Sequence, residues 1–144
     1  MKDLSKQPGY RFHYVRLLHA NYNLDPSLVQ LPEKFENKFD YGDSFEMIEN
    51  KLLIKQTGKI SIYTGNSEQK KEILSLEVVI EGLFETTGLE NIASDEFGTK
   101  NAPVILFPYL REIIFRLTSN MGTISPVLLP PINVIALKES KAAK

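Results

Sequence analysis

The segment from Val104 to Leu117 constrains the fold most, because its apolar residues leave almost no polar side on a helix. The apolar positions are Val104, Ile105, Leu106, Phe107, Tyr109, Leu110, Ile113, Ile114, Phe115 and Leu117. A helix that is apolar on all sides must be buried on all sides, which a single small sheet cannot achieve. We therefore predict that copies of the chain associate around this helix.

Flanking residues set the expected limits of the helix. Asn101 is a favoured N-cap residue and Pro103 suits the first turn, so we expect the helix to begin there and residues 91–99 to form a loop. Asn120 and Gly122 are typical of a helix end. Residues 123–131 contain prolines and should be extended, and a short last helix should start at Val134 or Ile135.

The first half of the chain reads as strands. Alternation from Tyr10 to Tyr22 predicts a strand, and residues 34–41 predict a second one that ends at the Gly42 turn signal. The expected apolar face of the first strand consists of Tyr10, Phe12, Tyr14, Leu18, Ala20 and Tyr22.

A hairpin should follow these strands. A strand over residues 52–62, with a bulge at Gly58, turns at Gly65 and returns over residues 71–84. Leu74, Leu76, Val78 and Ile80 share one side of the returning strand. Strands followed by helices predict an α+β fold in a single domain over residues 1–144, with flexible segments at 1–9 and 138–144.

Composition excludes several classes of function. The net charge is −1, which gives no electrostatic reason to bind nucleic acid or an anionic membrane surface. No cysteine is present, so disulfides and thiolate chemistry are excluded. The polar N-terminus lacks the pattern of a secretory signal, and the apolar run 104–110 is shorter than the roughly 20 residues of a membrane span. We expect a cytoplasmic protein without direct membrane binding.

Pairs of titratable residues do not assemble an active site. His13 and His19 lie about 20 Å apart along a strand, too far to share a metal. Glu77 and Glu81 are about 13 Å apart, whereas paired glycosidase carboxylates are separated by roughly 5–9.5 Å. We predict no catalytic residue, no metal and no cofactor, and hence no enzyme. The surplus of apolar residues indicates interaction surfaces instead.

Residues 101–137 resemble the corresponding segment of the SecB protein-export chaperones. The matching motifs are Leu106-Phe107-Pro108-Tyr109 with Arg111-Glu112, then Gly122-Thr123, and Leu129-Pro130-Pro131-Ile132-Asn133. The resemblance implies a four-stranded antiparallel sheet packed with two C-terminal helices, assembled as a homotetramer that is a dimer of dimers. It also implies ATP-independent holding of unfolded polypeptides in apolar grooves.

The resemblance places the grooves beside the loop after the first strand and the loop before the last helix. The expected polypeptide-binding residues are Leu28, Val29, Leu31, Ile124, Val127, Leu128, Leu129 and Ile132. We expect contacts between copies to use Leu76, Val78, Ile113, Ile114 and Leu117.

Export-type members also present acidic residues to the translocation ATPase. Asp25 and Glu77 match that surface, whereas Asn21 stands where an acid is expected and the usual acidic tail is replaced by Lys138–Lys144. Two hypotheses follow: a general export chaperone, or a chaperone dedicated to the antitoxin of a toxin–antitoxin pair, which a neighbouring operon would reveal. A third is a small-ligand-binding protein or enzyme, which needs convergent polar groups in a closed pocket.

Overall fold

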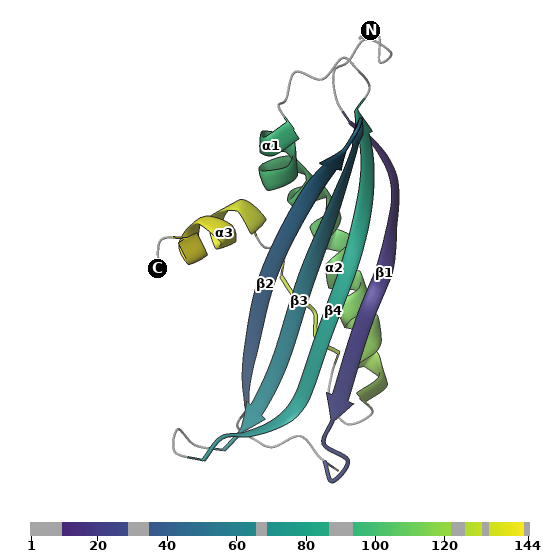
Figure 1. The fold of residues 1–144 in the computed structure, drawn as a ribbon. Helices are drawn as coiled ribbons and strands as arrows, with labels where there is room; N and C mark the ends of the chain where they lie inside the picture. The colour runs from purple at the N-terminus through teal and green to yellow at the C-terminus, as the bar shows by residue number, and fades with distance from the viewer. Residues whose placement is uncertain are drawn as a thin grey trace, which may run out of the picture.

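One antiparallel sheet with helices on one face makes up the structure, a computed structural model that describes residues 10–28, 35–65, 69–86, 94–121, 126–130 and 133–142 (Figure 1). The strands, in the spatial order β1-β4-β3-β2, are β1 (Tyr10–Leu24), β2 (Phe35–Ile48), β3 (Lys51–Thr64) and β4 (Lys71–Thr86). The helical segments are α1 (Ser94–Glu96), η2 (Phe97–Asn101), α2 (Ala102–Thr118), η3 (Ser119–Met121) and α3 (Val134–Ala142). The predicted α+β fold and four-stranded sheet are confirmed.

The core lies between the sheet and α2. The expected alternation holds in the hairpin, since every second residue from Leu52 to Ile62 in β3 and from Leu74 to Phe84 in β4 is buried. Fully buried side chains of the sheet include Leu52, Ile54, Ile62, Leu74, Leu76, Val78, Ile80 and Phe84. Helix α2 contributes Leu106, Leu110 and Ile114, each 0% exposed. Full burial of such a side chain is worth about 1.5–3 kcal/mol.

Gly58 does not form the predicted bulge. Pairing runs without interruption through Tyr41–Gly58 and Gly58–Val78. A Cβ at this position would lie 3.1 Å from Ile114 Cδ1 and 3.3 Å from Leu110 Cδ2. The glycine is therefore needed for the close approach of α2 to the middle of the sheet, which strand periodicity alone does not reveal.

Two irregularities in β1 correct the predicted apolar face. The register with β4 shifts between Phe12 and Tyr14, and again between Leu17 and His19. Each extra residue turns the following side chains to the other face. Phe12 accordingly stacks on Phe84 at 4.9 Å between ring centroids. Tyr14 faces away from the helices, so the prediction that it shares the face of Phe12 was wrong.

The second strand is longer than predicted. Gly42 pairs with Thr57 inside the β2–β3 ladder and is no turn. The chain reverses instead at Glu49, whose φ is 56°, and Asn50. Glycine can also occupy an extended position inside a strand, so the interpretation of Gly42 as a turn residue was wrong.

The helical region begins earlier than predicted. Residues 94–101 are already helical, and Asn101 has helical φ and ψ without a side-chain cap bond. The predicted loop is thus wrong at 94–99, while 91–93 lie outside the described residues. Helix α3 starts at Val134 as expected, and its N-terminus is capped by Asn133, whose Oδ1 accepts the Ala136 N–H at 3.0 Å.

Candidate functional site

Helix α2 has two different apolar faces. The face toward the sheet is buried, whereas four large apolar side chains on the outer face remain exposed to solvent. Their exposed fractions are 48% for Val104, 41% for Ile105, 39% for Tyr109 and 39% for Phe115. Clusters of exposed apolar residues mark interaction surfaces. The prediction that one chain cannot cover this helix is confirmed.

A hollow of about 300 Å³ adjoins this outer face. Its lining is Pro108, Arg111, Glu112, Phe115 and Leu128. Leu128 comes from the segment 126–130 and is 69% exposed, the largest exposure among the large apolar residues in the described part of the chain. Glu112 pairs with Arg116 at 2.7 Å on the solvent side. The hollow therefore has an apolar wall and a charged rim.

Thr118 fixes the segment that carries Leu128. The Thr118 side chain is buried at the end of α2, and its hydroxyl donates to the Ile114 carbonyl at 2.8 Å. The same oxygen accepts the Val127 N–H at 2.8 Å. Val127 is partly buried and Leu129 is 7% exposed, so Leu128 between them points outward. Thr118 was not identified from the sequence, because a threonine near a helix end carries no specific signal.

The predicted polypeptide-binding residues therefore separate into different environments. Leu28 and Val127 are partly buried against the core, and Leu128 is exposed. Leu129 belongs to the core, so its assignment to a binding surface needs correction: it has almost no surface to offer. Val29, Leu31, Ile124 and Ile132 lie outside the described residues.

Three of the residues expected at contacts between copies are buried within the single chain. Leu76 is 1% exposed, and Val78 and Ile114 are 0% exposed. A side chain without exposed surface cannot reach a second subunit, so these three assignments are corrected. Ile113 and Leu117 are partly buried against the core. The exposed side chains of α2 lie at neighbouring positions of the same helix.

Asp25 is occupied by structural contacts at the start of the loop after β1. Its carboxylate accepts the Ser27 N–H at 3.0 Å and the Ser27 hydroxyl at 2.8 Å, and it pairs with Lys71 Nζ at 2.9 Å. The hydrogen bond from Lys71, followed by those from Ser27, lowers the pKa of Asp25 to about 2. Its side chain is 16% exposed, so little of the carboxylate remains for a partner.

Glu77 lies on the open face of the sheet, opposite the helices. Lys59 Nζ lies 3.5 Å from one of its carboxylate oxygens and His19 Nε2 4.0 Å from the other. The same arrangement recurs along β4. Glu81 pairs with Arg16 at 2.9 Å, and Glu85 with His13 at 2.7 Å, which lowers the pKa of Glu85. Each acid of this row thus has a basic side chain of a neighbouring strand as a partner.

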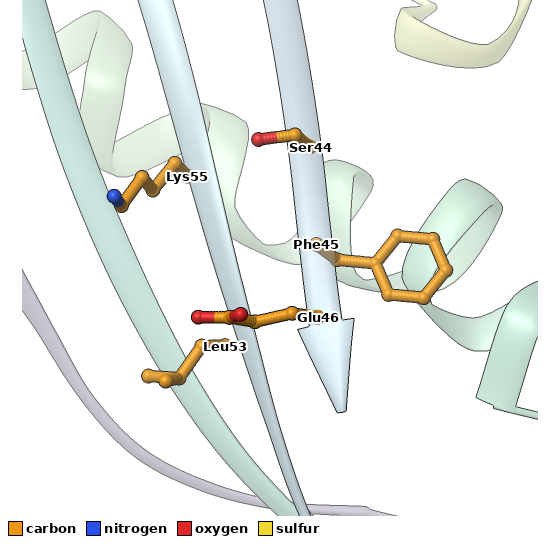
Figure 2. Close-up of a pocket in the computed structure, with 5 residues that line it drawn as sticks. All are labelled: Ser44, Phe45, Glu46, Leu53 and Lys55. Atoms are coloured by element: carbon orange, nitrogen blue, oxygen red, sulfur yellow. The ribbon is translucent and has the colours of Figure 1, made fainter. Parts of the chain in front are cut away.

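A second hollow, of about 230 Å³, lies at the β2–β3 side of the sheet (Figure 2). Ser44, Glu46, Leu53 and Lys55 line it from one side of these strands, while Phe45 points to the other. The polar side chains that line this hollow are exposed to solvent, so the hollow shows no preference for a particular ligand. In the described ranges, no group of three or more His, Cys, Asp or Glu side chains is placed to hold a metal ion.

Comparison with known families decides what this arrangement belongs to. The model of the SecB family, described as preprotein translocase subunit SecB, matches residues 44–144. The chain belongs to the SecB family. The resemblance of residues 101–137 to SecB is thereby confirmed. None of the helices in the described part of this SecB-family chain is long and apolar enough to cross a membrane.

Individual relatives include proteins named SecB and one uncharacterized protein. The protein-export protein SecB of Actinobacillus succinogenes is 31% identical over 112 residues, which cover 78% of this chain and 66% of that protein. An uncharacterized protein of Methanocaldococcus jannaschii is 39% identical over 130 residues, or 84% of this chain and 81% of that protein. The chain spans only 40% to 66% of three protein-export relatives that it matches.

A solved structure supports the fold. The SecB-like chaperone of Mycobacterium tuberculosis, in complex with a peptide from an antitoxin, has a TM-score of 0.66 and covers 85% of this chain and 90% of its own. The two sequences are 14% identical, so the similarity concerns the SecB fold alone.

Proposed function

We propose that the protein is an ATP-independent holdase chaperone that binds non-native polypeptides through apolar side chains. The exposure of Leu128 carries the proposal. Hydrogen bonding at Val127 and burial of Leu129 hold a large apolar side chain in solvent, beside the hollow formed with Pro108 and Phe115. An outward apolar residue on an extended segment can contact many sequences without strict complementarity. Family membership supports a chaperone rather than an enzyme.

The binding surface includes the start of the loop after β1. Leu28 packs partly against the core at this end of the sheet. We assign client contacts to Leu28, Val127 and Leu128, together with the predicted Val29, Leu31, Ile124 and Ile132.

Self-association uses the outer face of α2 in this proposal. Val104, Ile105 and Tyr109 are exposed apolar residues on one helix, and a second copy of this face would remove them from water. Partly buried Ile113 and Leu117 lie on the same helix. We assign a homotetramer built as a dimer of dimers, in the cytoplasm, without cofactor, nucleic-acid partner or direct membrane binding.

The client has two candidates. One is a range of preproteins for export, delivered to the motor ATPase; the other is a dedicated antitoxin. The ion pairs of Asp25 with Lys71 and of Glu77 with Lys59 favour the second, because acidic docking groups that already have cationic partners attract a basic motor surface less. The antitoxin peptide bound to the Mycobacterium tuberculosis relative supports the same candidate.

Direct binding tests the proposal and separates the two candidates. A fluorescent unfolded preprotein, the same protein folded, and an antitoxin fragment are each titrated with the chaperone without ATP, and anisotropy is followed. Micromolar or tighter binding of unfolded but not folded protein supports the general holdase. Binding of the antitoxin fragment alone supports the dedicated chaperone. Binding of none of them contradicts the proposal.

A further inference from the structure

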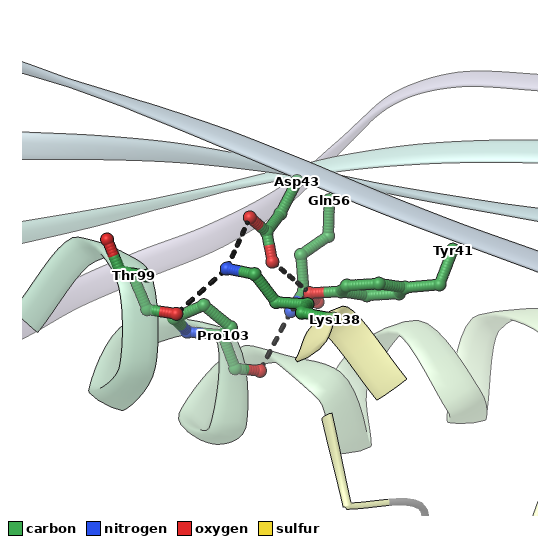
Figure 3. Close-up of polar contacts among 6 residues, drawn as sticks. All are labelled: Tyr41, Asp43, Gln56, Thr99, Pro103 and Lys138. Atoms are coloured by element: carbon green, nitrogen blue, oxygen red, sulfur yellow. Dashed lines mark hydrogen bonds and ion pairs between the residues drawn. The ribbon is translucent and has the colours of Figure 1, made fainter. Parts of the chain in front are cut away.

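A buried polar cluster joins α3 to the sheet and to the beginning of α2 (Figure 3). Lys138 Nζ on α3 donates to Asp43 Oδ1 of β2 at 2.9 Å and to the Thr99 carbonyl at 2.8 Å. The Tyr41 hydroxyl donates to the other Asp43 oxygen at 2.7 Å. Gln56 Nε2 donates to the Tyr41 oxygen at 2.6 Å and to the Pro103 carbonyl at 2.8 Å. Lys138 thus links α3 directly to β2 and η2, and Tyr41 and Gln56 extend the cluster to β3 and α2.

Lys138 supplies the charge that this cluster needs. The Asp43 side chain is 5% exposed, and that of Lys138 is 25% exposed. A buried carboxylate without a cationic partner is costly, so the lysine stabilises the closed arrangement. Burial and the neighbouring Asp43 raise the pKa of Tyr41, which keeps its hydroxyl protonated as a donor. Since β2 is an edge strand, departure of α3 would remove the cation that faces Asp43 at the edge of the sheet.

Among the described side chains of α3, few contacts besides those of Lys138 join the helix to the rest of the chain. The helix has nine residues, and isolated helices shorter than about 12–15 residues are marginal in water. Val134 is 2% exposed and Leu137 is partly buried against the core, whereas Ala136 and Glu139 face solvent. Helix α3 continues to Ala142, and the flexibility expected of residues 138–144 stays a prediction. Elements with so few buried contacts open locally, without global unfolding.

An aromatic surface lies in the same cluster of side chains. Tyr41 and Phe107 meet edge to face at 6.0 Å between ring centroids, and Phe39 meets Phe107 at 6.5 Å. Tyr41 is 5% and Phe107 4% exposed, and Val134 of α3 belongs to the same core. Val134 and Leu137 of α3 thus pack against the hydrophobic core to which Tyr41 and Phe107 belong, and we call this part of the core the seat of α3.

We propose that α3 is a detachable cover over this seat, that the Lys138–Asp43 pair sets how often it opens, and that an apolar segment of a non-native client takes its place. The proposal rests on the holdase function and adds a self-inhibited state to it. Client binding then competes with α3, so weakening the Lys138 contact raises the population of the binding-competent form.

Hydrogen exchange followed by mass spectrometry tests the cover. Lys138→Met keeps the aliphatic stem and removes the charge, and Glu139→Gln on the exposed side of the same helix is the matched control. We expect the amides of residues 134–142 to exchange about five- to tenfold faster in Lys138→Met, because a charge-assisted contact is lost. The amides of β3 and β4 should keep their rates in both variants.

Client affinity is measured on the same proteins. Lys138→Met should bind an unfolded client several-fold more tightly than the wild type, and Glu139→Gln should match the wild type. Three results would each overturn the proposal. They are unchanged exchange in α3, exchange that is equally accelerated throughout the sheet, and faster α3 exchange with unchanged client affinity. Asp43→Asn provides a second variant if Lys138→Met fails to fold. Failure of the wild type to bind clients rejects the holdase function separately, since exchange needs no client.

Discussion

The hydroxyl of Thr118 accepts the backbone N–H of Val127 at 2.8 Å, which ties the end of α2 to the segment that presents Leu128. Thr118 is itself buried and anchored to the Ile114 carbonyl at 2.8 Å. The orientation of the exposed leucine therefore depends on a polar contact inside the core. The Thr118 side chain therefore contributes both to the fold and to the position of the binding surface.

Replacement of Thr118 by valine tests this link. The substitution leaves the Val127 N–H without its acceptor, and an unpaired buried donor costs about 1–3 kcal/mol. We expect this loss in urea unfolding, together with faster hydrogen exchange at residues 126–130. Ser119→Ala is the control, because the Ser119 hydroxyl donates to the Arg116 carbonyl on the exposed side. Equal stability of Thr118→Val and Ser119→Ala would show that the contact does not hold the segment.

Leu128 and Leu129 form a matched pair for the binding surface. Leu128→Asp should reduce client affinity at least about tenfold with little change in stability, since the side chain is 69% exposed. Leu129→Asp should instead unfold the protein or destabilise it by about 3 kcal/mol or more, because it places a charge in the core. Anisotropy titration and thermal unfolding separate the two effects. Normal client affinity of folded Leu128→Asp would remove this residue from the binding surface.

The two faces of α2 predict two different defects. Ile114→Ala should lower stability by about 2–5 kcal/mol, because it opens a cavity under a fully buried side chain. Ile105→Asp, on the outer face, should leave the fold intact and shift the native mass toward smaller species. Native mass spectrometry and urea unfolding measure both. An unchanged mass for Ile105→Asp would argue against self-association through this face.

Acid stability should depend on Asp25. Its pKa is about 2 in the folded protein and about 4 in an unfolded chain. A carboxylate whose pKa is lower in the folded than in the unfolded state stabilises the folded state. This contribution is complete above a pH of about 4 and is lost as the pH falls from about 4 to 2. Asp25→Asn should therefore show a shallower decline of urea stability across this window. An identical pH profile in the two proteins would contradict the role of the Lys71 and Ser27 contacts.

The fold was largely predictable from the sequence, because periodicity reports directly on which face is buried. The alternation of Leu74, Leu76, Val78 and Ile80 predicted the core face of β4, and the apolar surplus of residues 104–117 predicted an uncovered helix. The register shifts in β1 were not predictable. The residues before and after the first shift are both aromatic, so the sequence pattern does not show that the strand changes face there. Gly58 was misread because close helix approach is a tertiary property.

Much of the candidate site depended on contacts distant in sequence. Lys138 begins the segment that was expected to be flexible, and only its position beside Asp43, 95 residues away, reveals the cluster. Asp25 matched an acidic docking position, yet the neighbouring strand supplies Lys71 as its partner. The exposed Leu128 was identified through the family resemblance, whereas its buried neighbour Leu129 was grouped with it. Adjacent residues of an extended segment face opposite ways, and the sequence alone does not show which of the two faces the core.

Suppression of aggregation tests the central claim most directly. An unfolded, aggregation-prone protein is diluted into increasing amounts of the chaperone without ATP, and light scattering is followed. The account predicts suppression at near-stoichiometric ratios by the wild type, and markedly weaker suppression by folded Leu128→Asp. Undiminished scattering with the wild type across several unrelated clients and an antitoxin would contradict the holdase function.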